Sequence, residues 1–227
     1  MNESILPAGV AAVASQLSEW PGMQHFYLAG GTALALQMGH RQSRDLDFFT
    51  TQPMTALPDL PGLDPFLQRF DRVEWVQRLP DQIHWRLEDV SVTLLAYPFL
   101  HHQAFLVWRG LSVADARDIA VQKAYTIGRR AHARDYLDLH CVLMSGVASL
   151  DEVMQQAQAT YHDAFSPRLF LQQLTYTQDV PDWDEALTLL TRPQSFAVIE
   201  RDLQAVVRSW AQRAFSPAPS CPKGPSL

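Results

Sequence analysis

Two aspartates stand inside what otherwise reads as a buried strand, the stretch "DLDFFT" at residues 45–50. Burying a carboxylate is costly unless a cation lies beside it. Because side chains on a strand alternate between its two faces, Asp45 and Asp47 project from the same face and repel each other. A divalent metal neutralises both, and ligands that are all oxygens favour Mg²⁺ or Mn²⁺ over zinc. The pair therefore predicts a metal site; the alternative is a solvated edge strand whose aspartates pair with Arg41 and Arg44.

A glycine pair lies shortly before these aspartates, in "LAGGTALALQMG" at residues 28–39. Gly30 and Gly31 follow a short apolar strand and open a helix that Gly39 ends. Glycine lets the backbone approach a phosphate closely, and the N-terminus of a helix is a ready anion site. An anion site opposite two metal-binding carboxylates indicates nucleoside triphosphate chemistry, in which the metal bridges the phosphates.

The first half of the chain reads as mixed helices and strands, and residues 51–65 read as a loop rich in Pro and Thr. Apolar residues at helical or alternating spacing distinguish the two kinds of element. The expected helices cover residues 4–19, 32–39 and about 65–72, and the expected strands cover residues 25–30, 45–50, 73–79, 82–89, 90–99 and 105–110.

From residue 112 the pattern is helical. Residues 112–146 read as helical throughout, with Ser112 as N-cap and Gly146 as C-cap, and further helices are expected at 149–162, 166–177 and 195–215. Ser149 and Glu152 have the spacing of a capping box. We expect an α+β fold with a small mixed sheet in residues 1–111, a helical bundle in residues 112–215 and a disordered tail in residues 216–227. A cleft between the two halves is the natural place for a site.

Composition excludes some classes of protein. The net charge of −6 argues against a molecule that binds nucleic acid over its whole surface, although a local basic patch remains compatible with it. Cys141 and Cys221 form no CxxC pair, so we expect free thiols and a reducing compartment. The N-terminus lacks a basic region typical of a signal peptide, and the uncharged run from Trp20 to His40 is too polar to span a membrane. We expect a cytoplasmic protein.

The motif spacing resembles that of a known superfamily. The pattern is similar to the signature of the polymerase β-type nucleotidyltransferases: an apolar residue is followed by Gly-Gly, then by thirteen residues and then by Asp-Leu-Asp-Phe. More narrowly, "GGTALAL…HRQSRDLDFF" together with "DIAVQKAYTIGRRAHARDYLDLH" resembles the AbiEii/AbiGii-type nucleotidyltransferase toxins of bacterial toxin–antitoxin and abortive-infection systems. The resemblance covers roughly residues 20–215. It implies a nucleotidyltransferase core, a nucleoside triphosphate (NTP) substrate, Mg²⁺ or Mn²⁺, a cognate antitoxin and an RNA acceptor such as a tRNA 3′ end.

The resemblance also implies roles for particular residues. The triphosphate would be held by Gly30, Gly31 and Thr32, and the metal by Asp45 and Asp47. Lys123 would contact nucleotide phosphate, and Asp135 would be the acidic residue of the helical motif. Ser43 occupies the place of a serine that is modified in some relatives; turn or cap chemistry is the simpler interpretation of it. Thr93 stands where a third metal-binding acid is common, which puts the ligation of a second metal in doubt.

The helical motif predicts a local basic face. Lys123, Arg130 and Arg134 are spaced i, i+7 and i+11, which places them on one face of a continuous helix. Long cations beside a negative pocket would neutralise a triphosphate or an RNA backbone. Asp135 and Asp138 would orient these side chains. The simpler alternatives are a surface lysine at 123 and intrahelical partners for Arg134 and Arg130 at the two aspartates.

Three hypotheses for the function follow. The first is a metal-dependent nucleotidyltransferase. The second, motivated by Thr93, is a catalytically silent protein that binds a nucleotide or a partner. The third is transfer of a phosphoryl group to a protein, such as the antitoxin or this chain at Ser43. The adjacent His101 and His102 point to opposite faces of a strand, so we interpret them as loop or packing residues and not as ligands of one metal.

Overall fold

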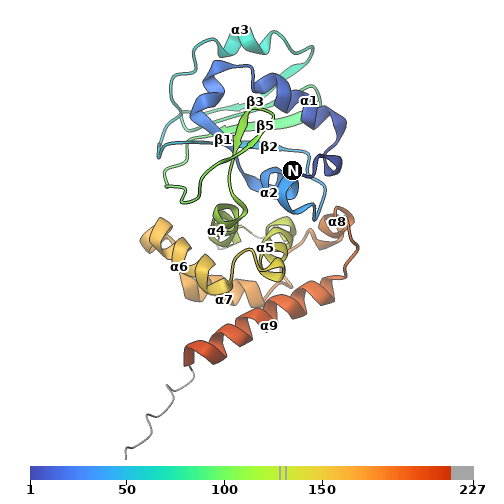
Figure 1. The fold of residues 1–227 in the computed structure, drawn as a ribbon, viewed down its shortest axis with the longest axis vertical. Coiled ribbons are helices and arrows are strands. Elements are labelled where there is room, and N and C mark those ends of the chain that lie inside the picture. Colours follow the sequence, from blue (N-terminus) through green and yellow to red (C-terminus); the bar gives the residue numbers. More distant parts are fainter. Residues whose placement is uncertain (128, 131, 216–227) are drawn as a thin grey trace, which may run out of the picture.

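A mixed β-sheet dominates the first half of the chain, and helices form the second half (Figure 1). The computed structural model describes residues 1–127, 129–130 and 132–215. This arrangement confirms the α+β fold with a helical C-terminal half. Within the described residues, no helix is both long and apolar enough to cross a lipid bilayer. The expected tail at 216–227, including Cys221, lies outside the described residues.

The sheet has seven strands in the order β3-β4-β5-β2-β1-β7-β6. The strands are β1 (Phe26–Leu28), β2 (Leu46–Thr50), β3 (Val73–Arg78), β4 (Gln82–Leu87), β5 (Val90–Leu95), β6 (Leu106–Trp108) and β7 (Leu111–Val113). Two neighbouring pairs are parallel, β2 with β5 and β1 with β7, and the other four are antiparallel.

The register of β2 places the second aspartate at the centre of the sheet. Along β2, Leu46, Phe48 and Thr50 are buried, whereas the alternate residues are partly exposed, as the period of two requires. Asp47 pairs with Thr93 on the parallel strand β5. Asp47 therefore projects from the face of the sheet opposite to Leu46 and Phe48.

The helices lie on both sides of the sheet. In Figure 1, α1 and α3 lie in the upper part of the view, whereas α2 and the C-terminal helices lie below the sheet, with α9 crossing the bottom. The helices are α1 (Ala8–Leu17), α2 (Gly30–Met38), α3 (Leu63–Leu67), α4 (Ala116–Ile127), α5 (Ala133–Ser145), α6 (Leu150–Tyr161), α7 (Pro167–Thr175), α8 (Trp183–Thr188) and α9 (Phe196–Phe215), with short 3₁₀ turns at Glu3–Ile5, Pro21–His25 and His162–Ala164. Helices α4 and α5 pack against α2, which joins the two halves of the chain.

The prediction of one helix over 112–146 is wrong. Ser112 is not an N-cap, because it lies in β7 and pairs with Tyr27; the helices begin only at Ala116. Helix α4 ends at Ile127, and α5 begins at Ala133. The N–H of Ala133 donates to Asp182 Oδ1 at 2.8 Å, so the start of α5 is capped from a distant part of the chain.

Smaller differences concern the ends of other elements. Helix α2 begins at Gly30, so both glycines belong to its first turn, and α3 is a shorter helix than expected. Helix α8 has no counterpart among the expected elements. The capping box at Ser149 is confirmed: the Glu152 N–H donates to Ser149 Oγ at 3.2 Å, and the Ser149 N–H donates to Glu152 Oε2 at 2.7 Å.

Candidate active site

The first glycine of α2 lies directly against the second aspartate of the motif. Gly30 has a φ of +64°, a conformation that favours glycine. A Cβ atom at this position would lie 2.9 Å from Asp47 Oδ2, so any side chain here would collide with the carboxylate. The glycine turn and the aspartate strand therefore form one structural unit, as their linkage in the sequence predicts.

The two aspartates share the edge of a pocket and differ in environment. Burial and the neighbouring charge of Asp45 raise the pKa of Asp47, against the opposing influence of Lys123 and a hydrogen bond from Thr93. Asp45 is more open to solvent, and its Oδ2 lies 3.8 Å from Arg134 Nη1. Since Arg134 is the ion-pair partner of Asp45 and Arg41 binds Asp138, the alternative in which both aspartates pair with Arg41 and Arg44 is wrong.

A hydroxyl pair holds the chain that leads into these aspartates. The hydroxyls of Thr32 and Ser43 are hydrogen-bonded at 2.7 Å between their Oγ atoms, and Thr32 also donates to the carbonyl of Asp45. Both residues are buried, and Ser43 also lines the pocket. Thr32 thus fixes the position of residues 43–45, and the Thr32 hydroxyl is used in these two hydrogen bonds.

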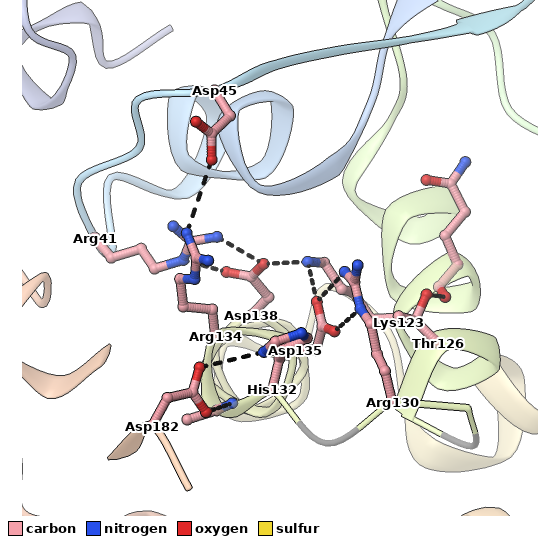
Figure 2. A network of polar contacts seen from close by, with 12 residues as sticks. Arg41, Asp45, Lys123, Thr126, Arg130, His132, Arg134, Asp135, Asp138 and Asp182 are labelled. Carbon is pink, nitrogen blue, oxygen red and sulfur yellow. Dashed lines mark hydrogen bonds and ion pairs between the residues drawn. The ribbon is translucent and has the colours of Figure 1, made fainter. Parts of the chain in front are cut away.

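An ion cluster formed by the buried Arg41, Lys123, Asp135 and Asp138 and the exposed Arg130 lies below Asp45 in Figure 2. Asp138 accepts from Arg41 Nε at 2.6 Å and Nη2 at 2.9 Å, and it also contacts Lys123 Nζ at 2.6 Å. Asp135 binds Lys123 Nζ at 2.7 Å and Arg130 Nε at 2.9 Å. Lys123 is therefore shared between two carboxylates.

The charges of this cluster hold each other in the ionised state. Burial alone would raise the pKa of Asp138, but Arg41 and Lys123 outweigh burial and keep this pKa well below its ordinary value. Burial alone would lower the pKa of Lys123, but the charges of Asp138 and Asp135 outweigh burial and raise this pKa above its ordinary value. The pKa of Asp135 is lowered by Lys123 and Arg130 in the same way, against burial. The cluster is fully charged at neutral pH.

These groups enclose a pocket of about 220 Å³, which we call the aspartate pocket. Its walls come from the α2 turn, the loop before β2, strand β5, helix α4 and the start of α5. Its lining residues are Gly31, Arg41, Ser43, Asp45, Asp47, Ser91, Lys123, Arg130, His132, Arg134 and Asp135.

The structure brings together most of the residues singled out from the sequence, although the elements that carry them differ from those expected. Lys123, Arg130 and Arg134 do not share one helix, because the chain turns back between α4 and α5, yet all three line the aspartate pocket. Lys123 is buried, so the interpretation as a surface lysine is wrong. Asp135 pairs with Arg130 and Lys123, and Asp138 binds Arg41 across the molecule. Because Arg130 lies between α4 and α5 and Arg134 pairs with Asp45, the interpretation of the two aspartates as intrahelical partners of Arg134 and Arg130 is wrong.

Several residues of the site were not singled out from the sequence: Ser91 and His132, and Arg41 as the partner of Asp138. Arg41 lies in the basic loop "HRQSRD", which was a visible signal, but its partner is 97 residues away and could not be paired with it. His101 and His102 lie in the loop between β5 and β6, so the interpretation as loop or packing residues is confirmed and their placement on a strand is wrong. His101 packs on Phe105, and the exposed His102 is hydrogen-bonded to Thr160 at 2.8 Å. Within the described residues, no group of three His, Cys, Asp or Glu side chains is arranged to hold a metal.

The fold and the glycine–aspartate site together define a nucleotidyltransferase. Residues 12–209 match the family model described as nucleotidyl transferase AbiEii toxin, type IV toxin–antitoxin system. The chain belongs to this AbiEii family of nucleotidyltransferase toxins.

The chain is similar to known proteins at two levels of sequence identity. An uncharacterized protein of Aquifex aeolicus, aq_aa25, is 30% identical over 177 residues, which cover 70% of this chain and 82% of that protein. Two solved structures share the fold at lower identity. A presumed nucleotidyltransferase from Helicobacter pylori has a TM-score of 0.57 at 17% identity, over 89% of this chain and 91% of that one. MenT4, a nucleotidyltransferase toxin from Mycobacterium tuberculosis, has a TM-score of 0.53 at 18% identity, over 88% and 82%.

Proposed function

We propose that this protein transfers a nucleoside monophosphate from an NTP to a hydroxyl group of an RNA, such as a tRNA 3′ end, and releases pyrophosphate. The observation that supports it most directly is the convergence of Asp45 and Asp47 with Arg130 and Arg134 on one pocket. Family membership supports the further proposal that it is the toxin of a cytoplasmic toxin–antitoxin system, kept in check by a cognate antitoxin.

We propose Asp45 and Asp47 as the ligands of a divalent metal, Mg²⁺ or Mn²⁺. The donor set fits such an ion, since burial and the neighbouring charge of Asp45 together raise the pKa of Asp47, and a cation would offset both effects. A bound cation would neutralise charge on the phosphates and polarise the phosphorus that is attacked. Thr93 supplies a hydroxyl, not a third carboxylate, beside Asp47.

The balance of charge around the pocket also favours a metal. Four cations (Arg41, Lys123, Arg130 and Arg134) face four carboxylates (Asp45, Asp47, Asp135 and Asp138), so the formal sum is +4 − 4 = 0. A triphosphate needs additional positive charge, and a divalent ion on the aspartates supplies it.

Among the chain's own cations, the two partly exposed arginines are best placed to contact phosphate. The side chains of Arg130 and Arg134 are 56% and 44% exposed, whereas Lys123 is fully committed to Asp135 and Asp138. Arginine binds phosphate oxygens through two parallel N–H groups. We therefore propose that Arg130 and Arg134 clamp the triphosphate beside the N–H groups of Gly30 and Gly31, and that Lys123 and Asp135 position Arg130.

The Asp47→Asn variant tests this mechanism. Label transfer from an α-³²P NTP to bulk tRNA should fall by at least about a hundredfold, because the amide removes one of two anionic metal ligands. The growth arrest caused by expressing the protein should disappear with it. Because folding raises the pKa of Asp47, the neutral amide should leave the free energy of unfolding unchanged or increase it. Asp89→Asn, at an aspartate that is 85% exposed, is the matched control.

The three hypotheses for the function predict different outcomes of these experiments. Full transfer by Asp47→Asn would overturn the mechanism. NTP binding by the wild type without transfer under any NTP, metal or RNA would favour the silent nucleotide-binding protein. A mass increase of the protein after incubation with NTP would favour transfer to a protein side chain. Ser43 is an unfavourable target for that reaction, since it is buried and hydrogen-bonded to Thr32.

A further inference from the structure

A second pocket, of about 580 Å³, adjoins the aspartate pocket and has no role in the reaction described so far. We call it the tyrosine pocket. It is built by the end of α4, helix α5 and the end of α7. Its lining residues are Ile127, Arg129, Arg130, Tyr136, Gln172, Gln173, Thr175, Tyr176 and Asp179.

Two features connect the pockets. Arg130 lines both of them. Asp135 and Tyr136 are consecutive on α5, and the first lines the aspartate pocket while the second lines the tyrosine pocket. Arg130 therefore forms a wall that the two pockets share.

The tyrosine pocket offers a flat apolar surface. Tyr176 is 58% exposed. Tyr136, by contrast, is buried, with its hydroxyl donating to the Gln173 carbonyl at 3.4 Å. An exposed aromatic ring beside a polar pocket is the arrangement that proteins use to stack a nucleobase.

The pocket also offers hydrogen-bond acceptors for the edge of a base. Gln173 Oε1 is buried without a hydrogen-bond partner in the part of the chain that the structure describes, so turning this amide towards a ligand sacrifices no bond. The carboxylate of Asp179 lines the same wall. A carboxylate and an amide oxygen accept from exocyclic amino groups, which adenine, cytosine and guanine have and uracil lacks.

We propose that the tyrosine pocket binds the base of the NTP, with Tyr176 stacking on it and with Gln173 and Asp179 selecting a base that carries an exocyclic amino group. This inference rests on the proposed function. The base of a nucleotide is joined to its phosphates through a single ribose, so its pocket has to share a wall with the phosphate pocket, as the tyrosine pocket does through Arg130. The base of an RNA acceptor has no such constraint.

Binding of non-hydrolysable α,β-methylene analogues of ATP, CTP, GTP and UTP, measured by calorimetry with Mg²⁺, tests the proposal. Tyr176→Ala should weaken the binding of amino-bearing analogues about tenfold, the loss expected for one stacked base. Tyr176→Phe should bind them as the wild type does. Asp179→Asn and Gln173→Ala should reduce the preference over the UTP analogue. Inorganic tripolyphosphate, which has no base, is the matched probe, and its affinity should be the same in all five proteins.

The outcomes separate this proposal from the proposed function. Unchanged nucleotide affinity in Tyr176→Ala would overturn the base pocket and leave nucleotidyl transfer standing. So would a variant that loses affinity for tRNA and keeps its affinity for nucleotides, because the pocket would then belong to the acceptor. The expected binding pattern without transfer to RNA would support the base pocket and overturn the proposed function. A wild type that binds no NTP would overturn both.

Discussion

At the scale of single residues, the aspartate pocket depends on glycines that leave room for charged groups. Gly31 lies in the first turn of α2 and faces the guanidinium of Arg41. A Cβ atom on Gly31 would lie 2.1 Å from Arg41 Nη2. Arg41 cannot move aside freely, because it is buried and Asp138 holds its Nε and Nη2 atoms.

Gly31→Ala should therefore destabilise the protein. The methyl group either displaces Arg41 from Asp138 or pushes α2 away from it, and such overpacking costs about 1–3 kcal/mol of the free energy of unfolding. Urea denaturation of the variant and the wild type measures this loss.

Gly9→Ala is the matched control, with an expected effect of opposite sign. Gly9 is a helical glycine of α1, and a Cβ atom there meets only Val90 Cγ2 at 3.9 Å. Alanine in this helix should increase the free energy of unfolding by about 0.5–1 kcal/mol, because it loses less backbone entropy than glycine. Equal effects of the two variants would show that the contact with Arg41 is unimportant.

The residues of the site were predictable from sequence where local spacing determines their positions. Asp45 and Asp47 share a strand face, and Gly30 precedes them by a short helix and loop, so their proximity follows from the pattern. The partner of Arg41 was not predictable, because Asp138 lies on another element and ion pairing leaves no local signal.

At the scale of elements, the same distinction holds for helix ends. Ser149 and Glu152 cap α6 through contacts within one turn, and the sequence predicts them. Helix α5, in contrast, is capped by Asp182, 49 residues away from Ala133. The sequence has a glycine at position 128, which is typical of a helix end. The helical pattern of the residues on both sides of it nevertheless favoured one continuous helix.

The turn between α4 and α5 is essential to the ion cluster. On one continuous helix, Lys123 and Asp135 would be separated by 12 residues, or about 18 Å along the axis. In the structure, Lys123 Nζ and Asp135 Oδ1 are 2.7 Å apart. Lys123, Arg130 and Arg134 thus reach one pocket because the helix is broken, and not because they share one helical face.

Ser149→Ala should lower the free energy of unfolding by about 1 kcal/mol, because it removes the acceptor for the Glu152 N–H. It also removes the hydroxyl that binds Glu152 Oε2 at 2.8 Å. Ser166→Ala is the matched control in α7, where Ser166 Oγ accepts from the Leu169 N–H at 3.3 Å and no reciprocal bond is formed. Thermal or urea unfolding should show the smaller loss for Ser166→Ala. Alanine keeps the backbone N–H that donates to Glu152, so a loss of equal size in both would mean that the additional bond between the Ser149 hydroxyl and Glu152 Oε2 contributes nothing.

At the scale of the whole molecule, the buried ion cluster joins the sheet half to the helical half. Arg41 follows α2, Lys123 belongs to α4, and Asp138 belongs to α5. His40 adds a further contact, with its Nε2 atom 2.8 Å from Asp138 Oδ1. Asp138 on α5 therefore binds both α4 and the loop after α2, and removing its contacts should destabilise the entire fold.

Asp138→Asn should destabilise the protein by about 3–5 kcal/mol at pH 7, because it leaves Arg41 and Lys123 buried with one carboxylate fewer. The pH dependence gives a second readout. Because the pKa of Asp138 is far below its ordinary value in the folded protein, its stabilising contribution is fully present above the unfolded-state pKa of about 3.9. That contribution is lost as the pH falls below this value towards the folded-state pKa. The free energy of unfolding of the wild type should therefore fall steeply below about pH 4, and that of Asp138→Asn should fall less steeply.

Asp89→Asn provides the comparison that isolates burial. Asp89 pairs with Arg72 at 2.6 Å, close to the distance of the Asp138–Arg41 contact, but these side chains are 85% and 65% exposed. An exposed ion pair contributes about 0–1 kcal/mol, so this variant should unfold almost as the wild type does at every pH. Urea unfolding at several pH values between 2 and 7 measures all three proteins. If the free energy of unfolding depends on pH in the same way in the wild type and in Asp138→Asn, Asp138 is not the group whose protonation destabilises the protein in acid.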